Sequence, residues 1–282
     1  MATQQQNKER VEFATRKEHF EEAFRLVYEE YLRKGYCSQI TSGMRATIYN
    51  ALPETVTFCL WREHTLIATA SLVPDSSIGL PMEKVYPEEI QVFREKGRKL
   101  CEISLLALNS DVIAKGILPL YLAERLRCLY LLFKPILWYA RKTAVCTDIC
   151  IAVNPVHKPL YSSLYFQEFG GERVYESVMG NPSIAMKLDL TQLENGTEKK
   201  TPGLYKLFLR NSLELKKISE FFRWNEQDFN YFFAEKSDAL NKAKPEQIEC
   251  LTRYFPELPI KQMAQQANPA YSHERPATKK CA

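Results

Sequence analysis

The chain has 282 residues, of which 45% are hydrophobic and 26% charged, a composition typical of a globular protein rather than a disordered or fibrous one. Its 38 Lys and Arg exceed its 34 Asp and Glu by only four, and this small, dispersed charge argues against a nucleic-acid-binding protein. Eight cysteines lie scattered without a CxxC pair, so neither a disulfide framework nor a zinc cage is indicated and we expect reduced, apolar cysteines.

Neither end of the chain nor its most apolar stretch predicts a membrane protein. Residues 1–13 lack the apolar segment of a secretory signal. The stretch 118–140 is interrupted by charged residues such as Glu124 and Lys134 and by Pro135, whereas a membrane span needs about 20 nearly uninterrupted apolar residues. We therefore expect a cytoplasmic protein without an integral membrane segment.

Hydrophobic periodicity predicts alternating strands and helices along the first 190 residues. In chain order these are a strand at 10–15, a helix at 20–31, a hairpin of strands at 55–62 and 66–73, a helix at 87–96, a strand at 100–108, a helix at 119–142, a strand at 145–153, a helix at 159–169 ended by Gly170-Gly171, and strands at 173–179 and 184–190. The nearly all-apolar strand at 145–153 is typical of a strand covered by helices on both faces. This order predicts an α/β fold with a central mixed sheet flanked by helices.

Beyond the core, the pattern changes from mixed to helical. We expect a core domain at 1–192, a polar linker at 193–203, a helical extension at 204–264 and a tail at 265–282 that lacks a packed core. Within the extension, helical spacing occurs at 204–222, 226–233 and 245–254.

Residues 67–107 form a run of unusual specificity. A strand ends near Asp75, the segment Gly79-Leu-Pro-Met-Glu83 and a short helix follow, and the next strand carries Glu102-x-Ser104. This order and spacing resemble the long-chain N-acyl amino acid synthases, in which a strand near an Asp leads to an LP(M/E)E segment, a helix and a strand with Glu-x-Ser.

A second stretch, Asn154-Pro-Val-His157-Lys-Pro-Leu-Tyr161, resembles the same family's strand-to-helix turn, written roughly N-x-x-H-x-x-x-Y. Together the two stretches extend the resemblance over about residues 15–190. It implies the GNAT-like acyltransferase fold, followed here by a C-terminal helical extension.

The chain is more distantly similar to the acyl-homoserine-lactone autoinducer synthases, which share the Glu-x-Ser strand and take an acyl group from acyl carrier protein. There the strand commonly continues Glu-x-Ser-Arg. Leu105 occupies the position of that Arg, which implies a different acceptor or a loss of activity.

The GNAT resemblance also bears on the acyl donor, which this fold holds in a splayed gap between two parallel strands. Many members that use coenzyme A carry an (R/Q)xxGx(G/A) loop for the pyrophosphate, but residues 106–119 contain a single glycine, Gly116. The resemblance therefore favours the acyl-phosphopantetheine of acyl carrier protein as donor, with no permanently bound cofactor or metal. The residues expected to contact the donor are Leu106, Ala107, Leu108 and Asn154.

Forming an amide from a thioester requires a general base and donors to the oxyanion. Glu102 is the expected base, and Ser104 faces the same side of the strand. The alternative is that Arg98 simply neutralises Glu102. His157 is the second catalytic candidate, as a proton shuttle or as a residue that only caps its loop.

The remaining candidates would bind the substrate. Tyr161 could protonate the leaving thiolate or belong to the core. Arg25 and Arg33 could bind a carboxylate in a bidentate pair. Asp75 and Glu83 could bind the acceptor amine, although solvated surface charges are the simpler interpretation.

The leading hypothesis is an enzyme that transfers a medium or long acyl group from acyl carrier protein to the amine of an amino acid or similar small molecule. One alternative is an acetyltransferase of the GNAT fold that uses acyl-CoA. The other is a non-catalytic module with this fold that binds a lipid or a protein.

Overall fold

The computed structural model describes residues 9–113, 118–192, 217–220 and 222–268. Seven strands form one sheet in the order β1-β2-β3-β4-β5-β7-β6. In chain order the strands are β1 (Glu9–Phe13), β2 (Val56–Arg62), β3 (Thr65–Pro74), β4 (Leu100–Leu108), β5 (Asp148–Val153), β6 (Gln167–Tyr175) and β7 (Asn181–Asp189). The helices are α1 (Lys17–Arg33), α2 (Pro87–Glu95), α3 (Leu118–Lys142), α4 (Lys158–Ser163), α7 (Glu226–Asn230), α8 (Pro245–Tyr254) and α9 (Ile260–Ala267).

The sheet is mixed, as the sequence predicts. β4 and β5 run parallel, and the other neighbouring strands pair antiparallel. A parallel pair needs a long crossover connection, which here contains α3.

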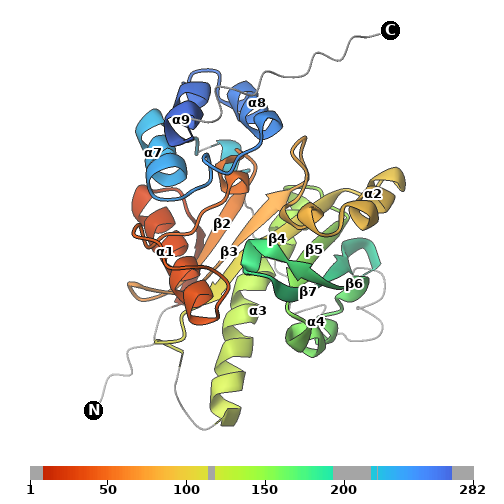
Figure 1. Cartoon of the computed structure of the whole chain (residues 1–282). Coiled ribbons are helices and arrows are strands. Elements are labelled where there is room, and N and C mark those ends of the chain that lie inside the picture. The colour runs from red at the N-terminus through yellow and green to blue at the C-terminus, as the bar shows by residue number, and fades with distance from the viewer. Residues whose placement is uncertain (1–8, 114–117, 193–216, 221, 269–282) are drawn as a thin grey trace, which may run out of the picture.

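The two faces of the sheet carry different helices (Figure 1). Successive side chains of a strand point to opposite faces of the sheet. Cys59 and Trp61 of β2 accordingly lie in the core shared with α1, whereas Phe58 and Leu60 lie in the core shared with α3. α2 packs on the α1 face through Ile90, and α4 joins the α3 face. The sheet is therefore covered on both sides.

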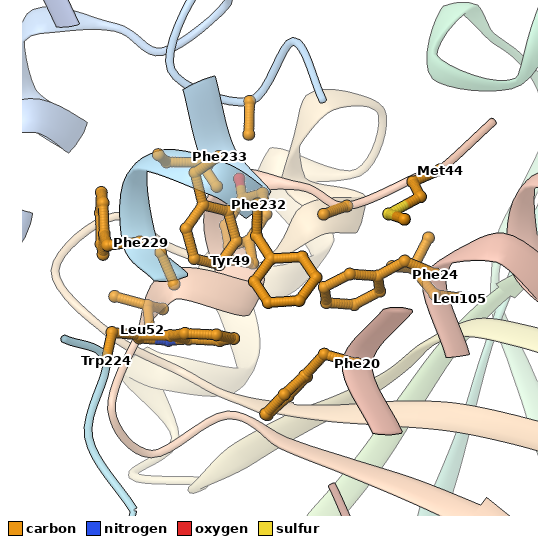
Figure 2. Packing of buried hydrophobic residues seen from close by; sticks show 14 of the residues in the cluster. Phe20, Phe24, Met44, Tyr49, Leu52, Leu105, Trp224, Phe229, Phe232 and Phe233 are labelled. Carbon is orange, nitrogen blue, oxygen red and sulfur yellow. The ribbon is translucent and has the colours of Figure 1, made fainter. Parts of the chain in front are cut away.

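The C-terminal helices share a core with α1 (Figure 2). Ring centroids lie 4.6 Å apart for Phe20 and Trp224 and 5.6 Å apart for Phe24 and Phe232. Residues far apart in the sequence thus complete one apolar core.

α8 has the predicted bounds, and α7 continues into a π-helical turn at Tyr231–Glu235. α9 reaches Ala267, two residues past the predicted start of the tail. The predicted linker and most of the helix predicted at 204–222 lie outside the described residues. The division into core, linker, extension and tail therefore stays a prediction.

The helix predicted at 159–169 is wrong in its second half. α4 ends at Ser163, Tyr165 adopts a positive φ of 66°, and β6 begins at Gln167. Gly170 and Gly171, predicted to end a helix, lie inside this strand. A side chain at Gly170 would collide with the ring of Tyr86, so the glycine serves close packing rather than helix termination.

The expectation of reduced cysteines is also corrected, because a disulfide joins Cys101 of β4 to Cys146, just before β5. The two cysteines are 45 positions apart, a spacing that does not predict a disulfide, and the parallel pairing of β4 with β5 brings them together. None of the helices in the described residues combines the length and apolar character that crossing a bilayer requires.

Candidate active site

The parallel strands β4 and β5 stay paired for only three residues. Their register runs from Leu100 opposite Asp148 to Glu102 opposite Cys150, and beyond this point the strands are no longer paired. On its other edge β4 contains a bulge: Ser104 pairs with Ser71 and Ala107 with Thr69, so three steps along β4 match two along β3. The strand therefore bends away from β5 just after Glu102.

Leu105 lies in the bulge with a φ of 51°, a left-handed conformation that is unusual for a non-glycine residue. Its side chain is buried in the core shared with α1. Leu105, which is expected from the sequence to stand in place of an Arg, thus packs into the core beside the gap.

A cavity of about 380 Å³ opens where β4 and β5 separate. Its size is within the usual range for small-molecule sites. Other parts of the chain line it besides the two strands: the end of α1 with the loop that follows, the 3-10 turn Pro81–Lys84, the helices α3 and α4, the β6–β7 connection, and residues 237–247 of the C-terminal region.

Glu102 lines this cavity and is only 3% exposed. Its Oε2 accepts a hydrogen bond of 2.8 Å from the backbone N–H of Met82. Burial raises the pKa of the carboxyl to about 8, against the opposing effect of the Met82 N–H. A carboxyl of this kind can exchange a proton near neutral pH.

Arg98 does not neutralise Glu102, contrary to the alternative that the sequence left open. Its guanidinium pairs with Asp148 at 2.5 Å and with Asp189 at 2.8 Å. Arg98 is therefore engaged away from Glu102, and the cation that acts on the carboxyl is Lys84, whose lowering of the pKa is smaller than the rise caused by burial.

Three tyrosines surround Glu102 along the cavity wall. Burial is the main cause that raises the pKa values of Tyr31, Tyr49 and Tyr175, and the negative charge of Glu102 raises each of them further. The pKa of Tyr31 rises to about 12. The hydroxyl of Tyr175 donates to the carbonyl of Pro81 at 3.0 Å. These phenols hold their protons at neutral pH and can donate hydrogen bonds.

Several other predicted site residues lie together at the cavity. They are Ser104, Leu106 and Leu108 on β4, Asn154 after β5, His157 before α4, and Tyr161 on α4. Ala107 instead packs into the core shared with α1.

His157 and Asn154 belong to one turn. The Asn154 side chain accepts a hydrogen bond of 3.1 Å from the backbone N–H of Val156 and so caps the turn. Burial, helped by the nearby charges of Lys34 and Arg125, lowers the pKa of His157. Its imidazole is therefore neutral near pH 7.

The predicted substrate-binding charges do not line the cavity. Arg25 is exposed on α1, and Arg33 pairs with Glu30 at 2.9 Å and Asp111 at 2.8 Å. Asp75 and Glu83 both pair with Arg94, which binds the two oxygens of Asp75 at 2.7 Å each.

Five cationic side chains that line the cavity were missed. They are Lys34, Arg45, Lys84, Arg125 and Lys242. Lys84 directly follows the Leu-Pro-Met-Glu segment, which is a usable signal, whereas Arg45 lies in an aperiodic loop that offers none. Within the residues described, no cluster of three His, Cys, Asp or Glu could hold a metal ion.

A mixed sheet with two splayed parallel strands, a bulge beside the gap and a cavity at their separation define an acyltransferase of the GNAT fold. The family model of the N-acyl amino acid synthase FeeM matches residues 22–189, well over half of the chain. The protein therefore belongs to the FeeM family of N-acyl amino acid synthases.

Solved structures share the fold. FeeM, an N-acyl amino acid synthase from uncultured soil microbes, is 26% identical, with a TM-score of 0.56 over 67% of this chain and 94% of that one. The acyl-homoserine-lactone synthase LasI is 14% identical over 74% and 99% of the two chains, with a TM-score of 0.50. BjaI, described as coenzyme-A-dependent, is 13% identical over 75% and 96%, also at 0.50. No curated protein matches the chain.

Proposed function

We propose that the protein transfers a medium or long acyl group from acyl carrier protein to the amine of an amino acid or similar small molecule. The observation that supports this most is Glu102, a buried carboxyl with a pKa of about 8 at the point where β4 and β5 separate. An amine is nucleophilic only when uncharged, and a base with this pKa can take up its proton.

In this reaction the amine nitrogen attacks the carbonyl carbon of the thioester. A C–N bond forms, the C–S bond breaks, and Glu102 accepts the proton that the amine loses, directly or through water. Tyr161 donates a hydrogen bond to the departing thiolate, since burial raises its pKa and keeps the phenol protonated. The products are an amide and a free thiol, because the proton that Glu102 accepted passes to the thiolate through solvent.

The gap between the strands suits an extended donor arm. Beyond Glu102 the edge of β4 that faces β5 has no strand partner, so its backbone groups are available to the amides of a phosphopantetheine chain. At the open end of the gap, Lys34 and Arg125 line the cavity beside His157. Cations there complement the phosphate of the arm.

The identity of the donor, acyl carrier protein or coenzyme A, is supported less strongly than acyl transfer itself. The single glycine between residues 106 and 119 leaves no two-glycine loop for a pyrophosphate, which favours the carrier protein. BjaI has the same fold and is described as coenzyme-A-dependent, so the fold alone is compatible with both donors.

The test supplies purified protein with an acyl carrier protein thioester, the matching acyl-CoA and a panel of amino acids and amines, and detects amides by mass spectrometry. We expect product from the carrier protein, with kcat/KM rising with pH to a plateau above an apparent pKa near 8. Glu102→Gln should lower kcat at least 100-fold, as loss of a general base usually does.

Glu88→Gln, an exposed glutamate on α2, is the matched control and should keep full activity. Product from acyl-CoA alone would favour the coenzyme A alternative. Absence of product with every donor and amine would overturn the enzymatic proposal and leave the binding module.

A further inference from the structure

Arg45 occupies a fixed position in the cavity wall. It lies between the buried residues Met44 and Ala46, and its backbone N–H donates to the carbonyl of Phe24 at 3.0 Å. Its Nη2 donates to the carbonyl of Ser177 at 2.7 Å, and its guanidinium lies 5.1 Å from the ring centre of Tyr31. The side chain is thereby fixed between α1 and the β6–β7 connection.

The guanidinium is nevertheless incompletely satisfied. Its Nε is buried without a hydrogen-bond partner, and no carboxylate pairs with Arg45 in the described part of the chain. Arg33, Arg94 and Arg98 each pair with at least one acid. A buried donor without a partner is costly, so the Nε of Arg45 needs an explanation, and a bound acceptor atom would provide one.

The surrounding charge also favours an anion. Lys84 and Lys242 line the same cavity; of the acids there besides Glu102, Asp238 is paired with Lys242 at 2.5 Å and Glu176 is exposed to solvent. The charges of Arg45 and Glu102 both affect the pKa of the Tyr31 phenol, so both residues lie near Tyr31 in the same part of the cavity. This part can receive a molecule with a carboxylate beside an amine.

We propose that Arg45 binds the carboxylate of the acceptor, so that the enzyme selects amino acids over plain amines. This inference rests on the proposed acyl transfer to an amine. An α-amino acid carries its carboxylate one carbon away from its amine. With the carboxylate on Arg45, the amine is directed toward Glu102, and the planar guanidinium fixes the orientation by two hydrogen bonds.

The experiment compares an accepted amino acid with its amide and its decarboxylated amine. Arg45→Gln keeps a donor for the Ser177 carbonyl but loses the charge. We expect KM for the amino acid to rise about 10- to 100-fold, while kcat and the KM values for the amide and the amine stay within about twofold. Arg45→Lys should recover part of the loss, because lysine restores the charge without the planar fork.

Arg253→Gln, which removes an exposed arginine on α8, is the matched control and should change no KM. Equal losses with all three acceptors would overturn the inference, because they would mean that Arg45 only holds the two loops together. An unchanged KM for the amino acid would overturn it as well.

Binding of the product separates this inference from the proposed function. Calorimetry with an N-acyl amino acid and the matching N-acyl amine needs no turnover, and Arg45→Gln should weaken only the first by about 10- to 100-fold. If the wild type forms no amide yet shows this selective loss, acyl transfer fails and the carboxylate site stands. If the variant binds both products like the wild type, or the wild type binds neither, the carboxylate site fails.

Discussion

Glu102 combines a position in the candidate site with a cost in stability. Its carboxyl is 3% exposed and receives a backbone hydrogen bond from Met82, yet burial still raises its pKa from the ordinary 4.5 to about 8. The folded protein therefore holds this proton more tightly than the unfolded chain does.

The pH dependence of stability follows from this difference. Between pH 4.5 and 8 the unfolded chain has released the proton while the folded protein retains it, so the free energy of unfolding falls by up to about 1.4 kcal/mol per pH unit. Glu102→Gln lacks this dependence. We expect the variant to gain stability relative to the wild type as pH rises through this window, measured by urea denaturation at several pH values. A constant difference between the two proteins would show that the pKa of Glu102 is not raised.

The residues of the candidate site differ in how well the sequence predicts them. Glu102 and His157 belong to spaced motifs, and both line the cavity, where their catalytic roles stay a prediction. Arg25 and Arg33 are expected to bind a carboxylate because acyl-transferring relatives close over the acceptor near the first helix, but a resemblance does not tell which exposed position of a helix faces a ligand. Arg45 comes from a loop, where contacts with distant residues such as Ser177 determine the orientation of a side chain.

At the scale of elements, β6 shows why a correct pattern can predict the wrong structure. Helical spacing and a Gly-Gly pair predict a helix that ends at residue 169, whereas the glycines lie in a strand beside α2. A Cβ at Gly170 would lie 2.6 Å from the ring of Tyr86, which is fully buried and donates to the carbonyl of Ser183 at 2.7 Å. The requirement for glycine at position 170 therefore becomes apparent only from its contact with Tyr86 in the folded structure. The other strands, which alternate or are wholly apolar, were predicted within a few residues.

Gly170 and Gly171 provide a matched pair for testing this packing. Because Tyr86 cannot move without losing its hydrogen bonds, Gly170→Ala should lower the free energy of unfolding by about 1–3 kcal/mol. A Cβ at Gly171 meets no atom within 4 Å, so Gly171→Ala should stay within about 0.5 kcal/mol of the wild type. Chemical denaturation measures both, and equal effects would contradict the proposed role of the Tyr86 ring.

At the scale of the whole molecule, the C-terminal helices and α1 depend on one core. Trp224 is 5% exposed and contacts Phe20, Phe232 and Phe233. Because this core spans both ends of the described chain, we expect the helices to unfold together with the sheet.

Trp224→Ala should therefore lower the stability of the entire protein by about 3–5 kcal/mol while the unfolding transition stays single. The neighbouring Arg223 is an exposed residue that pairs with Glu257 at 3.2 Å, and Arg223→Ala should cost less than about 1 kcal/mol. Circular dichroism during thermal unfolding measures both. Two separate transitions in the Trp224 variant would mean that the extension unfolds alone.

The shared core also affects how this protein can be shortened for laboratory work. The family match ends at residue 189, and a protein trimmed there would retain every strand of the sheet and Glu102. It would also uncover the aromatic side of α1, with Phe20 and Phe24, together with Tyr49 and Leu52 (Figure 2). A contiguous apolar patch of this kind promotes self-association. Poor solubility of the trimmed protein would then result from the loss of the C-terminal helices that cover this patch. A shortened form therefore needs polar residues in place of the aromatic residues of α1.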